Sequence, residues 1–166
     1  MKELSQVSIR RAGPPDAILV RDIVRSAYAK WVPVIGREPM PMTVEYAEAI
    51  ARNRIDLLEA GGMAVGLIET ILRDDHLYDD HLYIENIAVR PECHGRGYGR
   101  HLLAHAEDIA FSAGQGEIRL LTNAAFAANV VLYEHCGYTV THTEPFMGGT
   151  TLYLKKRLEG RLQESA

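Results

Sequence analysis

The strands and helices that the sequence predicts are ordered as in a mixed α/β (α+β) domain. Alternating or β-branched runs take turns with segments whose apolar residues recur at helical spacing. Glycines and prolines separate these segments, and 47% of the 166 residues are hydrophobic. A chain of this length buries about 69% of its surface on folding. We therefore expect one domain over residues 1–166.

The first half of the chain predicts a strand, two helices and a β-hairpin. The first helix has Asp16 as a candidate cap and continues to about Trp31. Prolines and a glycine predict a loop over residues 32–42, because proline lacks the amide donor that a continuing helix needs. Gly61 and Gly62 form the hairpin turn. The expected elements are a strand at 6–10, helices at 16–31 and 43–52, and strands at 56–59 and 63–73.

The second half contains a duplicated segment and then alternating strands and helices. The five residues 74–78 are repeated at 79–83, and the Asp-Asp-His spacing fits no standard metal-ligand set, so we expect no metal site. We expect a polar tail at about 159–166. The expected elements are strands at 82–89 and 118–122, helices at 98–112 and 127–136, and final strands at 138–143 and 150–157.

Composition and charge argue against several classes of partner. The formal net charge is −4, so long-range electrostatics would repel nucleic acid and anionic membranes. No apolar run reaches the ~18 residues that would span a bilayer. Cys93 and Cys136 provide no disulfide framework, and the first residues lack the apolar core of a secretory signal. We expect a cytoplasmic protein.

The most informative segment is residues 84–100, which reads as a strand, a glycine-rich turn and a helix. The turn and the helix N-terminus would form a local anion site, which Arg96 and Arg100 would make suitable for a pyrophosphate. A Walker loop is excluded because the required Lys is missing. A dinucleotide fingerprint is disfavoured because Leu102 stands where Gly or Ala is needed. A tight turn that binds nothing stays open.

Two motifs resemble the GNAT superfamily of acyl-coenzyme A dependent N-acetyltransferases. In that family a strand ending in Val-x-Pro precedes a loop with Gln or Arg, then Gly-x-Gly or Gly-x-Ala. Here the pattern is filled by residues 89–91 and 94–99, with His94 in place of the usual Gln or Arg. The second motif runs from Asn129 through Tyr133 to Gly137 and Tyr138. The order and separation of the two motifs are those of the family.

The resemblance implies a mixed, mostly antiparallel twisted sheet of about seven strands flanked by about four helices. It implies that acetyl-coenzyme A (acetyl-CoA) is the co-substrate, and that strands 82–89 and 118–122 splay apart around its pantetheine arm. A neutral imidazole at His94 offers one donor where Arg offers five, which shifts the pyrophosphate grip toward backbone amides and Arg96. The expected cofactor-binding residues are Ile87, Ala88, Val89, His94, Gly95, Arg96, Gly97, Tyr98, Gly99, Arg100 and Asn129.

Acetyl transfer to an amine needs a base, and a proton for the leaving thiolate. Glu85 is the candidate base, and a strand-face carboxylate paired with an arginine is its alternative. By resemblance Tyr133 is the general acid; a buried core tyrosine is its alternative. For Asn129 the alternative is a helix N-cap. Asn123 is expected to be a simple turn residue.

The expected function is transfer of the acetyl group from acetyl-CoA to a primary amine of a small molecule. A peptide or protein acceptor is the less favoured alternative. We expect the amine to attack acetyl-CoA directly in a ternary complex. The sequence shows no Cys or Ser nucleophile with an adjacent base, which a covalent acetyl-enzyme intermediate would need. By resemblance Tyr28, Trp31 and Met42 line the acceptor pocket, although the aromatic residues fit an ordinary core equally well. The alternative function is a non-catalytic acyl-CoA-binding sensor or interaction module. A homodimer through the last strands stays open, because no pattern supports it.

Overall fold

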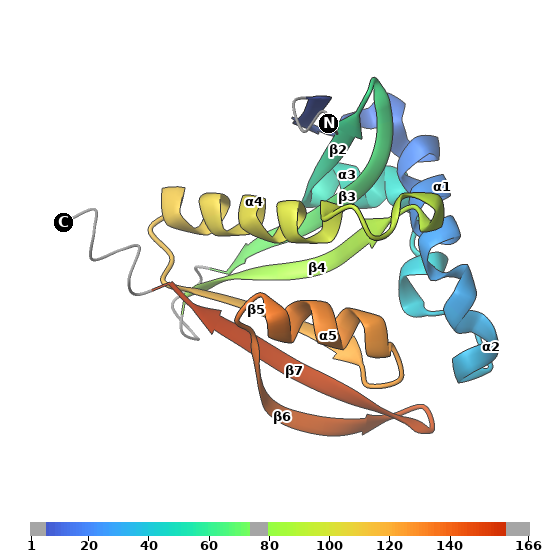
Figure 1. Cartoon of the computed structure of the whole chain (residues 1–166), viewed down its shortest axis with the longest axis vertical. Coiled ribbons are helices and arrows are strands. Elements are labelled where there is room, and N and C mark those ends of the chain that lie inside the picture. Colours follow the sequence, from blue (N-terminus) through green and yellow to red (C-terminus); the bar gives the residue numbers. More distant parts are fainter. Residues whose placement is uncertain (1–5, 74–79, 159–166) are drawn as a thin grey trace. The chain divides into compact units, whose positions relative to one another are not determined.

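The computed structural model describes residues 6–73 and 80–158. Within this part of the chain seven strands form one sheet, in the order β1-β2-β3-β4-β5-β7-β6 (Figure 1). The strands are β1 (Val7–Arg11), β2 (Arg54–Ala60), β3 (Met63–Arg73), β4 (His81–Val89), β5 (Glu117–Asn123), β6 (Thr139–Phe146) and β7 (Gly149–Arg157).

The pairing of the strands confirms the expected mixed, mostly antiparallel sheet. β1 pairs antiparallel with β2, and β7 pairs antiparallel with both β5 and β6. β4 and β5 run parallel, with the helix α4 in the connection between them. The helices are α1 (Ala17–Tyr28), α2 (Val32–Ile35), α3 (Tyr46–Arg52), α4 (Tyr98–Ser112) and α5 (Ala127–His135).

The chain divides into two compact units, and β3, β4 and α4 contribute residues to both. The first unit comprises Met1–Glu69 and Asn86–Leu102, and the second comprises Thr70–Glu85 and Leu103–Ala166. The expectation of a single domain over residues 1–166 stays a prediction. The expected polar tail, and residues 74–79 of the duplicated segment, lie outside the described residues.

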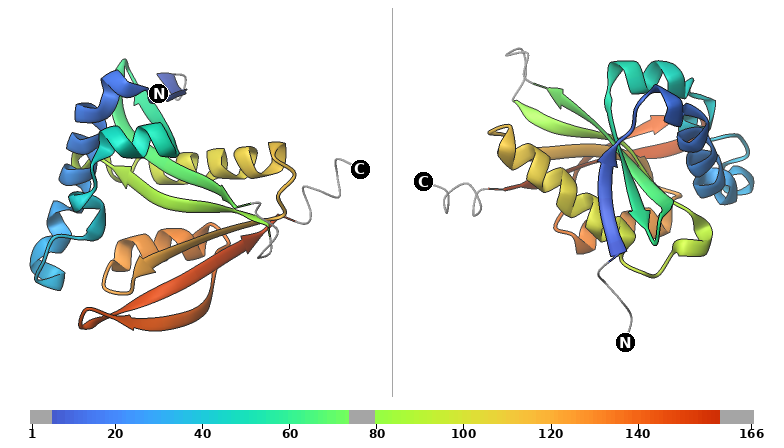
Figure 2. Two further views of the ribbon diagram at one scale, coloured as in Figure 1. Left: turned by 180° about the vertical axis from the view of Figure 1, so that it is seen from behind. Right: turned by 90° about the horizontal axis from the view of Figure 1, so that it is seen from above.

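In the first unit, the apolar face of α1 supplies much of the core. α1 and α3 lie side by side in both views of Figure 2. The expected cap of α1, Asp16, stands at the N-cap position without a capping hydrogen bond. Its carboxylate instead accepts the Gly13 amide at 2.9 Å and pairs with Arg10, which lowers the pKa of Asp16. The buried residues of α1 are Val20, Ile23, Val24, Ala27 and Tyr28.

The expected loop at residues 32–42 is wrong in part, because it contains two short helices. The first is α2, and the second is the 3-10 helix η4 (Met40–Thr43). In both, a proline occupies the first turn, where its missing amide costs no intrahelical hydrogen bond. α2 ends at Gly36, whose φ of 75° is left-handed. α3 consequently starts at Tyr46, three residues later than expected.

In the second unit, the central part of α4 and one face of β5 and β7 supply the core. Leu120 on β5 lies opposite Leu154 on β7, and both are buried. β6 is exposed at every one of its eight residues and forms a hairpin with β7 (Figure 1). The other buried apolar residues here include Leu103, Ala106, Ala110, Ile118, Tyr133 and Tyr138. Among the described helices, none combines the length and the apolar character needed to cross a membrane.

Candidate active site

The last residues of β4 are held by β3 on one edge. Among the described residues, the ladder between β4 and β5 ends at the pair formed by Ile84 and Leu120. Just after β4, the amide of Arg90 donates to the carbonyl oxygen of Val65 on β3 at 2.8 Å. Because neighbouring residues of a strand direct their backbone groups to opposite edges, those of Val89 point away from β3. That edge is where the family resemblance implies that the pantetheine arm binds.

Gly66 on β3 allows β4 to approach closely at this point, and the sequence analysis did not identify it. A Cβ atom at Gly66 would lie 2.8 Å from the carbonyl oxygen of Ala88 and 3.3 Å from a methyl group of Val89. Real Cβ atoms essentially never make a contact as short as 2.8 Å, and the atom met there is a backbone oxygen, so the position needs glycine. A glycine inside a strand pattern is the available sequence indication of such an approach.

The expected glycine-rich turn connects β4 to α4, after the 3-10 helix η5 (Pro91–Cys93). Gly95 and Gly97 have φ values of 79° and 82°, which lie in the left-handed region. A Cβ atom at either position would meet nothing within 4 Å. The left-handed backbone conformation therefore favours glycine at both positions, whereas no neighbouring atom of the described chain would collide with a Cβ atom there.

The side chain of His94 faces the strand and contacts its last residue. The His94 Nε2 lies 2.9 Å from the carbonyl oxygen of Val89. In the neutral imidazole with its proton on Nε2, the single donor is engaged by this carbonyl. This hydrogen bond gives a reason to expect that backbone amides and Arg96, and not His94, would bind a pyrophosphate.

The turn also places positive charge at the N-terminus of a long helix. α4 begins at Tyr98, and its first residues include Gly99 and Arg100. The amide of His101 donates to the Gly97 carbonyl at 3.0 Å, so the amides before it have no acceptor one turn back in the helix. Arg96 and Arg100 are exposed beside these amides. Together they form a site with the charge and the donors that a pyrophosphate needs.

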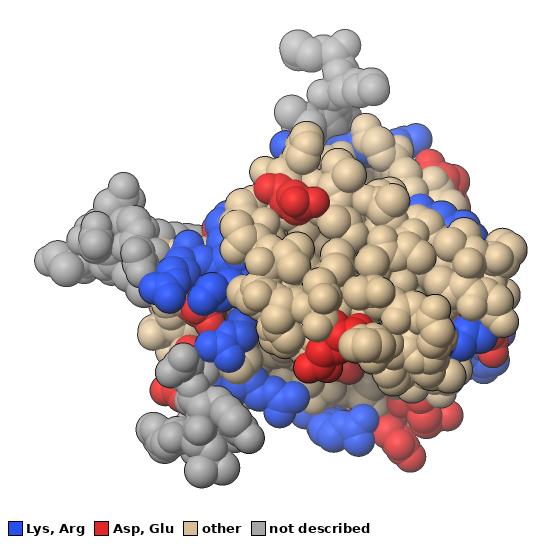
Figure 3. Space-filling view, turned by 90° about the horizontal axis from the view of Figure 1, so that it is seen from below, with Lys and Arg blue, Asp and Glu red and all other residues tan. Residues whose placement is uncertain are grey.

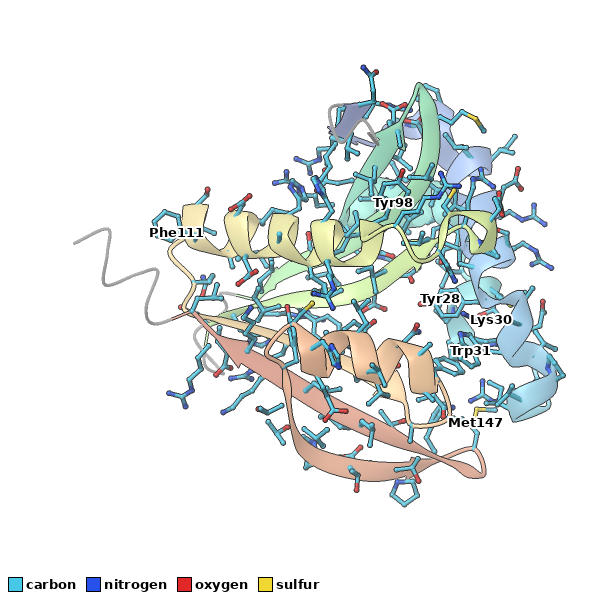
Figure 4. All side chains as sticks on the ribbon, viewed as in Figure 1. Tyr28, Lys30, Trp31, Tyr98, Phe111 and Met147 are labelled. Carbon is cyan, nitrogen blue, oxygen red and sulfur yellow. The ribbon has the colours of Figure 1, made fainter. Side chains whose placement is uncertain are left out.

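Two of the three expected acceptor residues, Tyr28 and Trp31, lie one turn apart at the end of α1 and in the adjoining 3-10 helix η3 (Ala29–Trp31), as Figure 4 shows. Tyr28 is buried and its hydroxyl lies 2.7 Å from Asn86 Oδ1. Trp31 is half-buried, with the Lys30 Nζ 4.7 Å from its ring centroid. The third, Met42 in η4, is half-buried, and its carbonyl accepts from Arg25 at 3.2 Å. Their contact with an acceptor stays a prediction.

In the second unit, Tyr133 and Asn129 lie one turn apart on α5. Tyr133 is 5% exposed, and its ring meets that of Tyr138 edge-on at a centroid distance of 6.1 Å. α5 begins at Ala127 with Phe126 at the N-cap position, so the N-cap alternative for Asn129 is wrong. Asn129 is half-buried in the first turn. Its expected cofactor contact stays a prediction.

Glu85 and Asn86 are successive residues of β4, so their side chains point to opposite faces of the sheet and differ in burial. Glu85 is exposed, whereas Asn86 is 5% exposed. Burial, and then the Glu85 charge, raise the pKa of Tyr83 above its usual range.

The side chain of Asn123 at the end of β5 accepts a hydrogen bond from the Ala125 amide at 2.9 Å, as expected of a turn residue.

The described ranges contain no metal-ligand cluster, and one face of the molecule carries a large uncharged area. No group of three or more His, Cys, Asp or Glu side chains in the described ranges could hold a metal ion. On the face drawn in Figure 3, charged side chains of both signs surround a large uncharged area.

Comparison with known proteins places the chain among acyl-group transferases. The model of the "Acetyltransferase (GNAT) family" matches residues 21–138. The PaiA N-acetyltransferase of Thermoplasma acidophilum in complex with coenzyme A superposes with a TM-score of 0.77 and 18% identity, over 91% of this chain and 98% of that chain. A comparison with curated protein sequences gives no match.

Two further solved structures cover nearly the whole chain. The yncA protein of Salmonella typhimurium with its cofactor acetyl-CoA has a TM-score of 0.70 and 20% identity, over 93% of this chain and 95% of that chain. The ribosomal-protein-S18-alanine N-acetyltransferase of Escherichia coli has a TM-score of 0.72 and 21% identity, over 92% and 94%. At these identities the structures show a shared fold.

Proposed function

Because the chain belongs to the acetyltransferase (GNAT) family, whose co-substrate is acetyl-CoA, we propose that it transfers the acetyl group to a primary amine of a small molecule. The observation that carries this proposal is the turn before α4. There, left-handed Gly95 and Gly97 precede a helix N-terminus flanked by Arg96 and Arg100. This combination suits a pyrophosphate, which acetyl-CoA contains.

Residues of the first unit would bind the pyrophosphate and the thioester-bearing pantetheine arm of acetyl-CoA. Amides of residues 95–100, with the two arginines, would hold the pyrophosphate. The outward edge of residues 87–89 would hydrogen-bond the pantetheine arm as an added strand does. Acetyl-CoA supplies the acetyl group as a thioester, and the Val89 amide would bind the thioester carbonyl.

The proposed chemistry divides the proton transfers between two side chains. An alkylamine with a pKa near 10.4 is largely protonated at neutral pH, so Glu85 accepts its proton directly or through a water molecule. The amine nitrogen then attacks the thioester carbonyl carbon to form a tetrahedral intermediate, in which the C–N bond is made. The nitrogen loses its second proton to water, and the C–S bond breaks. Tyr133 donates its proton to the departing sulfur, because a phenol of pKa near 10 protonates a thiolate of pKa near 8.5 only slightly uphill. Tyr133 regains a proton from water after the thiol leaves. Asn129 would contact the cofactor arm.

The acceptor side of the proposal rests on Tyr28, Trp31 and Met42. The E. coli relative acts, by its name, on an alanine of a ribosomal protein, so a peptide N-terminus is the second acceptor class to test.

The proposed location is the cytoplasm, where a reducing environment suits the free thiols of Cys93 and Cys136. We propose no nucleic acid or membrane partner, and a homodimer stays open.

The alternative is a module that binds acyl-CoA without turnover. The occupied acid and base positions, Tyr133 and Glu85, favour the enzyme over this alternative. The exposed position of Glu85 agrees with access to a substrate amine.

The test is thiol release from acetyl-CoA with a panel of small amines, polyamines, amino acids and short peptides. Acetylated product in step with thiol release supports the enzyme, and the same panel ranks small amines against peptides. Coenzyme A binding by calorimetry without transfer to any amine of the panel would establish the binding module instead. If neither binding nor transfer is observed, both functions are wrong.

A further inference from the structure

Three buried polar side chains in the first unit form a continuous hydrogen-bonded chain. Tyr28 from α1, Tyr46 from α3 and Asn86 from β4 are each less than a tenth exposed. The Tyr28 hydroxyl lies 2.7 Å from Asn86 Oδ1, and Asn86 Nδ2 lies 3.2 Å from the Tyr46 hydroxyl. The Tyr46 hydroxyl lies 2.7 Å from the carbonyl oxygen of Pro41 in η4.

Each hydrogen bond in this chain is donated in the same direction, from Tyr28 toward Pro41. Tyr28 gives its proton to Asn86 Oδ1, which is closer than the Ile87 carbonyl at 3.3 Å. With its oxygen turned to Tyr28, Asn86 presents its NH₂ group to Tyr46. Tyr46 accepts this bond and therefore has its own proton available for Pro41. Hydrogen bonds aligned in this way strengthen one another in a buried environment.

This chain matters for η4 because η4 contributes no buried side chain and packs mainly against α1. No residue of Met40–Thr43 is buried. Two backbone carbonyls of this segment are bound from neighbouring elements: Pro41 by Tyr46, and Met42 by Arg25 of α1 at 3.2 Å. The Tyr46 contact thus adds to the packing against α1 a directional hydrogen bond that connects η4, through Asn86, to β4.

We infer that Asn86 and Tyr46 are positioning residues, which fix η4 against the end of β4 and so determine recognition of the acceptor amine. The inference rests on the proposed function, in which Met42 of η4 lines the acceptor pocket and the edge of residues 87–89 binds acetyl-CoA. Asn86 immediately precedes that edge. Through Tyr46 it connects the segment that carries Met42 to the strand edge that would bind acetyl-CoA.

Two substitutions break the link at different atoms. Tyr46→Phe keeps the ring and removes the donor to Pro41. Asn86→Asp accepts from both tyrosines, so it turns the Tyr46 proton away from Pro41 while keeping every side chain in place. Tyr138→Phe is the matched control, because it removes a buried tyrosine hydroxyl that has no partner among the described residues.

The experiment measures KM for the best amine of the panel, Kd for coenzyme A by calorimetry, and hydrogen exchange of residues 36–46. Loss of a neutral hydrogen bond predicts a KM raised about tenfold in Tyr46→Phe and in Asn86→Asp, with Kd changed less than about twofold. Exchange in residues 36–46 should rise in both variants and stay native in the control. Because both act on one link, the double variant should be no worse than either single variant.

The inference is wrong if a folded Tyr46→Phe variant keeps the native amine KM and native exchange in residues 36–46. It is also wrong if the amine KM and the coenzyme A Kd rise together, since that indicates a general loss of structure. If the native protein acetylates no amine, the proposed function fails separately. Exchange of residues 36–46 in Tyr46→Phe then decides: an increase supports the link, and native exchange rejects it.

Discussion

The imidazole of His94 is bonded to the carbonyl oxygen of Val89, with 2.9 Å between Nε2 and the oxygen. The first residue of the glycine-rich turn is thereby fastened to the last residue of β4. The peptide that follows Val89 is also held on its other side, because the Arg90 amide donates to Val65. His94 therefore supports the strand end instead of offering its donor to a phosphate.

This geometry predicts different effects for the basic residues of the turn. His94→Ala should weaken coenzyme A binding by about threefold, and His94→Gln should restore it, because an amide donor can replace the lost hydrogen bond. Arg96→Ala should weaken binding by about tenfold or more at low salt and by less at high salt, because its contribution is a screened charge interaction. Calorimetry at two ionic strengths measures both. A strongly salt-dependent loss in His94→Ala would instead place the imidazole on the phosphates.

The conformation of Gly97 makes a prediction that separates strain from ligand contact. Gly97→Ala and Gly62→Ala introduce a Cβ atom at the same φ of 82°, and neither Cβ would meet an atom of the chain within 4 Å. Each should cost about 1 kcal/mol of unfolding free energy in urea titrations. Only Gly97→Ala should also reduce coenzyme A affinity, because only that backbone would lie against the pyrophosphate. Equal affinities in the two variants would move the pyrophosphate away from the turn.

The sequence predicted the parts of this molecule that depend on local patterns. The strand Met63–Arg73 and the helix Tyr98–Ser112 lie where alternation and helical spacing placed them. The helical turns at α2 and η4 differ from the predicted loop, because the rule that proline breaks a helix does not hold at a helix start. At the first turn of a helix, proline lacks only an amide that would be unpaired anyway.

The candidate site was predictable to the extent that its residues are neighbours in the chain. The glycine-rich turn is one contiguous segment with its charges beside it, so its chemistry could be inferred directly. Asn86 meets Tyr46 and Tyr28 from 40 and 58 residues away, and no local pattern marks such a contact. The need for glycine at Gly66 likewise comes from the Ala88 carbonyl on the next strand, which is distant in the sequence.

Gly66 predicts a large loss of stability from one added methyl group. In Gly66→Ala the new Cβ would lie 2.8 Å from the Ala88 carbonyl, so a backbone has to move. Overpacking of this kind should lower the unfolding free energy by about 2 kcal/mol and weaken coenzyme A binding through the displaced strand end. Gly13→Ala is the control, because its Cβ would meet Pro15 at an ordinary 3.7 Å. Similar stability of the two variants in thermal unfolding would show that β4 adapts without cost.

Tyr133 and Tyr138 make the last prediction, because they are buried neighbours with different expected roles. If Tyr133 is the general acid, Tyr133→Phe should lower kcat by about 100-fold and leave the coenzyme A Kd nearly unchanged, because only the proton donor is lost. Tyr138 has a hydroxyl without a partner in the described part of the chain, and burial raises the pKa of Tyr138 above its usual range.

The control for this prediction is therefore Tyr138→Phe, which keeps the ring packed edge-on against Tyr133. Removing an unsatisfied buried hydroxyl should leave kcat near native and keep or raise the melting temperature. Steady-state kinetics with the best acceptor of the panel and thermal unfolding measure both variants. A native kcat in Tyr133→Phe would assign the proton transfer to another group. An equal loss in both variants would show that disturbed packing of α5, and not the missing proton, slows the reaction.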